Sequence, residues 1–324
     1  KIRPNSAVVL NNFGLLKKID NDIQQAILLF EKAIEIESEY KNARTNLANS
    51  LMMAKRFESA LYHYELINTA QSQAQVLEVL YILERYDELI TRLEVLAKQD
   101  RINIRVAAVS AFASNQVGFY NPYDFCREPL KFIKISNIRD YRRDSEAFIK
   151  GIEKEVLAKD LVWEPGNKTT KFGFQTDDTV FQTGPACREL EKILHHALDA
   201  YHQTFCDSDS YFIDLWPRKY KIAGWFVKLV KKGFQKAHIH PSGLLSGIIY
   251  LKTITNAKDN EGAIEFILHD GQLPKLKEPV PRILHQPKIG DIVLFPSSLY
   301  HKTIPIRQNQ ERSVIAFDLL LEDR

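Results

Sequence analysis

Several features that mark large classes of protein are scarce in this chain. It has only three cysteines, Cys126, Cys187 and Cys206, which lie far apart and form no CxxC pair. We therefore expect neither a disulfide framework nor a structural zinc site, and we expect a reducing, cytoplasmic location. No apolar run approaches the ~20 residues needed to span a bilayer, and the opening stretch lacks the apolar core of a signal peptide. The chain opens on Lys1 rather than Met, so the sequence does not say what precedes it.

An excess of charge of either sign is also missing. The 44 Lys and Arg residues balance 41 Asp and Glu residues, which leaves a net charge of +3. That balance excludes the basic stripe of a typical nucleic-acid binder and a polybasic membrane patch, so we expect neither partner. With 45% hydrophobic and 26% charged residues, the 324-residue chain has the composition of a globular protein. Its length predicts about two domains, and the oligomeric state is left open.

Residues that break helices are almost absent from the first third of the chain. Gly14 is the only glycine before Gly118, and Pro4 is the only proline before Pro122. The first ~115 residues are therefore expected to form helices with short connections.

These helices repeat. When the sequence is aligned with itself at an offset of about 34 residues, Ala26 superposes on Ala60 and Phe30 superposes on Tyr64. Small residues at such positions let two helices approach closely, and the aromatic rings fill the space beside them. The period of the repeat is about 34 residues, which is typical of a helix–turn–helix solenoid.

The same offset superposes Gly14 on Ala48, and residues 73–96 look like a third, degenerate unit. Residues 1–117 therefore resemble the tetratricopeptide (TPR) repeats. The resemblance implies a helical solenoid that binds a peptide or protein partner on its concave face. No residue in the segment identifies the ligand.

The second domain is expected to span residues 118–324. It opens with a loop that contains Asn121-Pro122, and two amphipathic helices follow at residues 145–157 and 187–205. After Pro217 the sequence is rich in short runs of β-branched and aromatic residues. The predicted strands are residues 224–230, 244–254, 262–270, 290–297 and 312–321. Five strands without intervening helices predict an antiparallel barrel or jelly roll, with the preceding helices packed outside it.

Eight of the nine histidines follow residue 194, so metal or acid–base chemistry is expected in the second domain. His238 and His240 are two residues apart, and in a strand their imidazoles point to the same face. Pro241 favours an extended conformation at His240. His301 lies far along the chain from this pair, and Arg312 follows His301 at the start of the last predicted strand. Together these residues predict a metal site with a nearby cation.

The motifs HxHP…LSGxxYL and GDxxLFPSxLxH resemble those of the 2-oxoglutarate/Fe(II)-dependent dioxygenases, from about Phe125 to the C-terminus. The resemblance implies a double-stranded β-helix, which is a jelly roll with its metal at one open end, and the cofactors Fe(II) and 2-oxoglutarate. It assigns His238 and His301 to iron, and it assigns Arg312 to the far carboxylate of 2-oxoglutarate. Ser246 and Tyr250 share a strand face, and we expect them to contact the co-substrate.

One position departs from the family pattern. Where the usual His-x-Asp/Glu…His triad has a carboxylate, this chain has His240. This departure has three possible explanations. His240 binds iron as a third histidine, two histidines and water hold the metal, or an acid from another strand, such as Glu265, replaces the missing carboxylate ligand. We favour His240 as the ligand. Imidazole also suits zinc, copper and nickel, so the choice of iron comes from the resemblance alone.

The leading hypothesis is thus an Fe(II)- and 2-oxoglutarate-dependent dioxygenase, an oxidoreductase that hydroxylates a peptide, a protein or a substrate delivered by a partner. A second is a three-histidine, cupin-type dioxygenase that does not use 2-oxoglutarate. A third is a TPR adaptor whose barrel is inactive. The substrate cannot be inferred from the chain.

Overall fold

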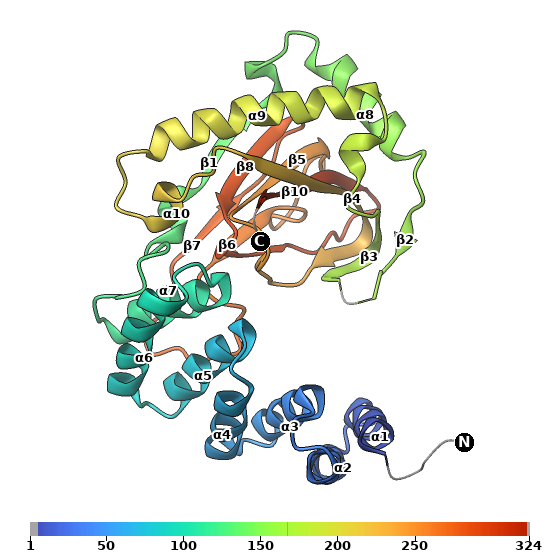
Figure 1. Ribbon diagram of the computed structural model, residues 1–324. Coiled ribbons are helices and arrows are strands. Elements are labelled where there is room, and N and C mark those ends of the chain that lie inside the picture. Colours follow the sequence, from blue (N-terminus) through green and yellow to red (C-terminus); the bar gives the residue numbers. More distant parts are fainter. Residues whose placement is uncertain (1–5, 167, 323–324) are drawn as a thin grey trace. The chain divides into compact units, whose positions relative to one another are not determined.

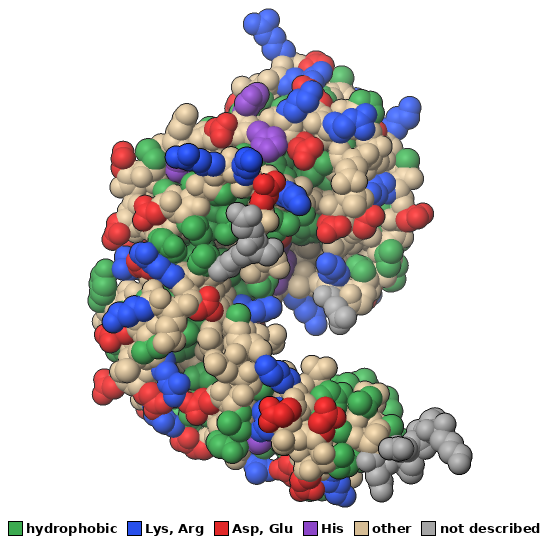
Figure 2. All heavy atoms as spheres, viewed as in Figure 1, with side chains coloured by type: hydrophobic (Ala, Val, Ile, Leu, Met, Phe, Trp, Pro, Cys, Tyr) green, Lys and Arg blue, Asp and Glu red, His purple; other side chains and the backbone are tan. Residues whose placement is uncertain are grey.

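The computed structural model describes residues 6–166 and 168–322. The chain divides into two compact units, Lys1–Gln99 and Asp100–Arg324, each of which is described by itself below. Among the described residues, no helix is both long enough and apolar enough to cross a bilayer. Figure 2 shows cationic and anionic side chains mixed over the visible surface of the second unit.

The first unit is built of helices in sequence order (Figure 1). Its described helices are α1 (Ala7–Ile19), α2 (Ile23–Ile36), α3 (Lys41–Met53), α4 (Phe57–Ile67), α5 (Ala70–Ile82) and α6 (Tyr86–Gln99). Each helix packs on the next, as expected of helical hairpins stacked in a row. The first and second hairpins begin at Ala7 and Lys41, which are separated by the expected period of about 34 residues. The third begins at Ala70, after a shorter interval that fits its degenerate sequence.

Small residues permit the close packing of these helices. A Cβ atom at Gly14 would lie 2.5 Å from Cε1 of Phe30, so α1 approaches the ring of α2 as closely as a glycine allows. Ala26, Ala60 and Tyr64 are likewise fully or almost fully buried. The helices begin at side-chain caps where the sequence provides them, for example where Asp22 accepts a hydrogen bond from the backbone of Gln25.

Helix α7 (Ile104–Val117) belongs to the second unit, which begins at Asp100 rather than at residue 118, where we placed the domain boundary. Burial explains the difference, because α7 is enclosed along nearly its whole length and does not present an exposed face. The side chain of Gln116 accepts hydrogen bonds from the backbones of Leu276 and Lys277, at 2.9 and 3.0 Å. These contacts attach the helix to the rest of the second unit.

The second unit contains two antiparallel sheets. Their strands are β1 (Lys134–Asn137), β2 (Val162–Trp163), β3 (Thr170–Gln175), β4 (Tyr220–Gln235), β5 (Leu245–Lys252), β6 (Ile264–Ile267), β7 (Arg282–His285), β8 (Asp291–Pro296), β9 (Tyr300–Thr303) and β10 (Arg312–Leu321). The larger sheet has the order β1-β8-β5-β10-β4-β3-β2, and the smaller has the order β7-β6-β9. The five predicted strands correspond to β4, β5, β6, β8 and β10.

The two sheets enclose a common apolar core. Val227 and Ile248 of the larger sheet belong to the same buried cluster as Ile264 and Phe266 of the smaller one. The ring of Phe266 meets that of Phe295 edge-on, with centroids 4.9 Å apart. The second unit is therefore a sandwich of antiparallel sheets, as the jelly-roll prediction requires.

Helices cover one side of this sandwich (Figure 1). They are α8 (Ser145–Val156), α9 (Pro185–Phe205) and the short α10 (Tyr211–Asp214), with single 3₁₀ turns at Pro129–Phe132, Ile138–Asp140 and Val180–Gln182. Helices α8 and α9 are strongly amphipathic, which is why the sequence predicted both of them. The strands β2 and β3 were not predicted, because their polar, glycine-containing segment has no strand periodicity.

Candidate functional site

Two of the three candidate metal ligands lie directly opposite each other. The chain leaves β4 at Gln235 and continues to His238, which pairs with His301 of β9. Each histidine donates its backbone N–H to the carbonyl of the other, at 3.1 Å in both directions. The backbone N–H of His240 donates to the carbonyl of Ser297, at 3.0 Å. Main-chain pairing therefore fixes the positions of all three residues.

The imidazole rings of His238, His240 and His301 converge. One ligand nitrogen from each lies within 4.8 Å of the others, the only such group of three metal-ligating side chains found among the residues that the structure describes. The ring centroids of His238 and His301 are 4.3 Å apart, and both lie 5.1 Å from that of His240.

Hydrogen bonds orient each ring in the same way. Nδ1 of His238 lies 2.7 Å from the carbonyl of Lys236, and Nδ1 of His301 lies 3.2 Å from the carbonyl of Leu299. Because a carbonyl oxygen only accepts, each Nδ1 carries the proton and each Nε2 keeps its lone pair. Nδ1 of His240 donates to the carboxylate of Asp318. In all three rings Nδ1 is engaged, which leaves Nε2 as the nitrogen that can bind a metal, as is usual for histidine ligands oriented by a second hydrogen bond.

Burial favours the neutral form of His238 and His301. It lowers the pKa of His238 to about 3, and the neighbouring His240 contributes to the same shift. The pKa of His301 lies well below its ordinary value, because the ring is buried and His238 and His240 stand beside it. A metal ion would therefore not have to displace protons from these two ligands at neutral pH.

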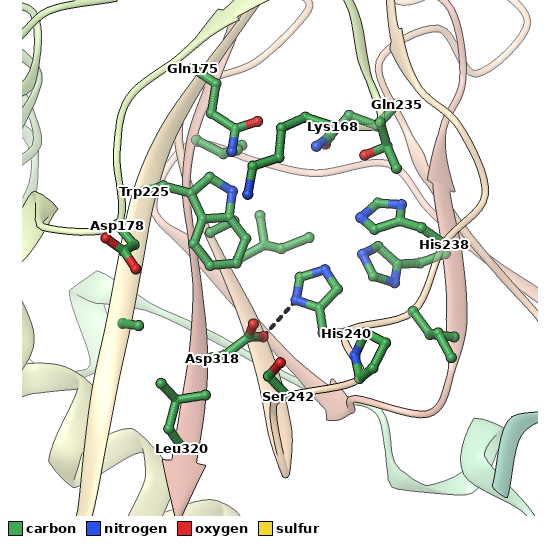
Figure 3. Close-up of a pocket in the computed structure, with 18 residues that line it drawn as sticks. Lys168, Gln175, Asp178, Trp225, Gln235, His238, His240, Ser242, Asp318 and Leu320 are labelled. Atoms are coloured by element: carbon green, nitrogen blue, oxygen red, sulfur yellow. Dashed lines mark hydrogen bonds and ion pairs between the residues drawn. The ribbon is translucent and has the colours of Figure 1, made fainter. Parts of the chain in front are cut away.

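The histidines line a cavity of about 430 Å³. Figure 3 shows Trp225 of β4 beside His240, with ring centroids 5.5 Å apart, and Gln175 of β3 on the wall above it. Lys168 and Asp178 add charged groups of opposite sign to the lining. The cavity has room for a small acid and for one side chain of a larger substrate.

Arg312 is the most unusual buried residue of this unit. Its side chain is only 1% exposed, and none of its three nitrogens has a hydrogen-bond partner within the described structure. The guanidinium carbon lies 4.9 Å from the ring centre of Tyr250, whose buried hydroxyl is equally unpartnered among the described residues. Burial raises the pKa of Tyr250, while the charge of Arg312 opposes the rise. A buried cation and a neighbouring buried hydroxyl that both lack hydrogen-bond partners among the described residues form a suitable binding site for an anion.

Ser246 does not join this pair. Its hydroxyl donates to Oδ1 of Asp318 at 2.7 Å and lies 2.8 Å from the hydroxyl of Ser297. Ser246 therefore contacts the carboxylate that lies behind His240, and its expected contact with the co-substrate stays a prediction.

Glu265 is not the missing acid ligand. It lies outside the group of convergent metal-ligating side chains, and its carboxylate pairs with Lys302 at 2.7 Å and Arg282 at 3.2 Å. Its neighbour Phe266 faces the core between the sheets, so Glu265 must face the other way. Strand alternation thus turns the Glu265 carboxylate away from the core face of β6.

Asp318 is the site residue that sequence reasoning missed. It lines the cavity from β10, and its carboxylate accepts from Nδ1 of His240 at 2.6 Å. The spacing offered a signal, because Asp318 and Arg312 are separated by an even number of positions on one strand, which places both on one face. Val314 and Ala316 between them line the same cavity.

The strands that carry the site match a known family. Residues 223–318 match the family model described as "Putative 2OG-Fe(II) oxygenase". No curated protein matches the chain.

Several solved structures resemble it. A prolyl-4-hydroxylase of Pseudomonas putida is 12% identical, with a TM-score of 0.40, and the match covers 58% of this chain and 91% of that one. HygX of Streptomyces hygroscopicus, with nickel and 2-oxoglutarate bound, is 15% identical, with a TM-score of 0.42 and coverages of 60% and 87%. A prolyl hydroxylase of Trichoplax adhaerens, in complex with a hypoxia inducible factor peptide fragment, is 13% identical, with a TM-score of 0.42 and coverages of 70% and 93%.

Proposed function

We propose that this chain, which carries a 2OG-Fe(II) oxygenase domain, hydroxylates a peptide or protein substrate with the help of Fe(II) and 2-oxoglutarate. The family match over residues 223–318 supports the reaction class. The observation that carries the assignment is the convergence of three histidine nitrogens, together with a buried Arg312 on the same strand as Asp318 whose guanidinium has no hydrogen-bond partner among the described residues.

The residues present fit both cofactors. The Nε2 atoms of His238, His240 and His301 hold the metal, and three imidazoles leave positions on it for other ligands. Arg312 and the hydroxyl of Tyr250 hold the far carboxylate of 2-oxoglutarate, which satisfies the polar atoms that are otherwise buried alone.

Bound iron supplies the redox chemistry, in which O₂ and 2-oxoglutarate become succinate, CO₂ and one hydroxyl group on the substrate. The protein supplies orientation and a dry, shaped space. Arg312 fixes the direction of the diacid, and its bidentate fork selects a carboxylate over a neutral group. Trp225 and Gln175 form the wall against which a substrate side chain is positioned.

The two alternative functions are less well supported. A three-histidine dioxygenase that ignores 2-oxoglutarate has no use for a buried, unpartnered guanidinium, yet Arg312 is 1% exposed. An inactive adaptor has no need of three imidazoles with their Nδ1 atoms all engaged from behind.

The first unit is the recognition device in this proposal. Its repeated helical hairpins resemble TPR units, and they form a groove of about 260 Å³ lined by apolar and polar side chains, among them Tyr64, Asn68, Val76 and Val95. Such a mixed groove suits an extended peptide. A cytoplasmic location remains a prediction from the cysteine content.

The test of the reaction is succinate release. Purified protein with Fe(II), ascorbate and 2-oxoglutarate should form succinate slowly without substrate, and His301→Ala should reduce this to the background rate. A parent protein that forms no more succinate than His301→Ala would refute the oxygenase assignment.

The test of the recognition role uses a peptide library and mass spectrometry to find a peptide that gains one oxygen atom. Val95→Glu should then raise the KM for that peptide, while succinate release without peptide stays unchanged. Val8→Glu is the matched control, because Val8 is similarly exposed but does not line the groove. Equal KM values for the two variants would separate the repeats from substrate recognition.

A further inference from the structure

The carboxylate of Asp318 stands directly behind one of the three histidines. A single oxygen, Oδ1, accepts from Nδ1 of His240 at 2.6 Å and from the hydroxyl of Ser246 at 2.7 Å (Figure 3 shows the first bond). The hydroxyl of Ser297 lies 2.8 Å from that of Ser246, which extends the chain of hydrogen bonds to the turn after β8. The side chain of Asp318 is only 12% exposed.

Strand register holds this network in place. Asp318 lies opposite Ser246 in the pairing of β10 with β5. Gly243 leaves the space that the network occupies, because a Cβ atom there would lie 2.6 Å from Oγ of Ser297 and 3.1 Å from Cγ of Asp318. The carboxylate is therefore positioned by backbone geometry and close packing rather than by a flexible surface chain.

The charge of Asp318 has an unusual environment. Among the ion pairs of the described residues, its partner is His240, and no Lys or Arg nitrogen pairs with it. An imidazole that binds a metal through its other nitrogen is neutral, so the divalent cation on the far side of that ring would compensate the buried carboxylate. Asp318 is thus the carboxylate that contacts the histidine cluster, and it does so through the His240 ring instead of as a direct ligand.

We propose that Asp318 is the positioning residue that replaces the missing carboxylate ligand, acting on the metal through His240. This inference rests on the proposed metal-dependent function. Three neutral imidazoles leave a divalent ion with its full +2 charge, and the hydrogen-bonded carboxylate returns the local charge to about +1. Through its bond to Nδ1, Asp318 also fixes the ring orientation and makes Nε2 of His240 a stronger donor.

The experiment measures Co(II) binding to the full chain without 2-oxoglutarate, by titration and by the Co(II) absorption spectrum. Asp318→Asn keeps an acceptor oxygen and loses the charge, so Co(II) affinity should fall about 10–100-fold and the spectrum should shift. Ser246→Ala is the matched control. It removes the other hydrogen bond to the same oxygen but keeps the charge, and its effect should be clearly smaller.

A second pair of variants tests the replacement itself. His240→Asp restores the usual ligand carboxylate but places it against Asp318, so it should bind Co(II) poorly. Adding Asp318→Asn should then raise Co(II) affinity at least about tenfold. Asp318→Asn should thus lower Co(II) affinity in the parent protein and raise it in the His240→Asp variant. A merely structural role for Asp318 would not produce this reversal.

The outcomes separate this inference from the proposed function. Unchanged Co(II) affinity in Asp318→Asn, or an equal loss in both backgrounds, overturns the role of Asp318 even where the parent forms succinate. The sign reversal in a protein that never forms succinate supports Asp318 while the oxygenase reaction fails. A parent that binds no Co(II) overturns both.

Discussion

Replacing Arg312 by methionine should change two properties in opposite directions. The guanidinium is buried, and its three nitrogens have no hydrogen-bond partner within the described residues. Without an anion, this charge costs stability, because a buried ion keeps only part of the solvation it had in water. With 2-oxoglutarate bound, the same charge becomes one half of a charge-assisted pair. Arg312→Met should therefore weaken co-substrate binding and stabilise the ligand-free protein.

Both magnitudes follow from the burial. Breaking a buried charge pair costs about 3–5 kcal/mol. At about 1.4 kcal/mol per decade, 2-oxoglutarate affinity should fall by about a hundredfold to a few thousandfold. Replacing buried charges by apolar groups of similar volume often stabilises a protein by about 1–4 kcal/mol. For a unit of this size, the melting temperature of the ligand-free protein should rise by roughly 2 °C or more.

Calorimetry with 2-oxoglutarate in the presence of Mn(II), and thermal unfolding without either, measure the two effects. Arg312→Lys is the control, because it keeps the charge but loses the bidentate fork; its affinity should be intermediate, and it should gain no stability. Metal affinity should barely change in either variant. Arg312→Met with the affinity of the parent protein, or with a lower ligand-free melting temperature, would refute this account of the buried charge.

The remaining predictions concern the rest of the second unit. Ligand-free protein should lose stability as the pH falls below about 6.5, because the unfolded chain binds protons that His238 and His301 do not bind in the folded protein. The loss should be up to about 1.4 kcal/mol per pH unit for each buried histidine. In urea unfolding, the difference in unfolding free energy between pH 7 and pH 5.5 should be smaller for His301→Leu than for the parent. Burial alone would raise the pKa of Glu261, but hydrogen bonds from Gln308 and Arg307 outweigh it and lower that pKa to about 2. Its contribution to stability should be present above about pH 4.5 and lost as the pH falls towards 2, so Glu261→Gln should destabilise at pH 7 and converge with the parent in acid. Gly247→Ala should cost about 1–3 kcal/mol in the same assay, since a Cβ atom there would lie 2.2 Å from the ring of Phe317, and an unchanged midpoint would contradict the packing argument.

Much of the second unit could be predicted from local sequence patterns. The strands β5, β8 and β10 are continuous apolar runs bounded by turn residues, and that pattern follows from their burial between two layers. The convergence of His238 and His301 was implied by the family resemblance, and their ring centroids lie 4.3 Å apart. The strands depend on short-range periodicity, which a single sequence displays.

Other features depend on contacts between distant segments. The end of the first unit at Gln99 is set by the burial of α7, which a helical pattern alone does not reveal. The polar segment that contains β3 forms a strand because β4 offers it a long edge, and not because its residues favour one. Tertiary pairing overrides local propensity at both places.

The charge of the metal site is the clearest case of information that is spread along the chain. In the proposed metal site, the HxH motif would supply two ligands locally, but it also lacks the carboxylate that would ordinarily lower the charge of the centre. The compensating Asp318 lies 78 residues after His240 and is positioned by the registers of β10 with β5 and of β5 with β8. A substitution in a ligand motif therefore has to be assessed against the residues that face it across the sheet. In this chain, we infer that Asp318, which pairs with Ser246 across the sheet, allows a third histidine to occupy the position where a carboxylate is usual.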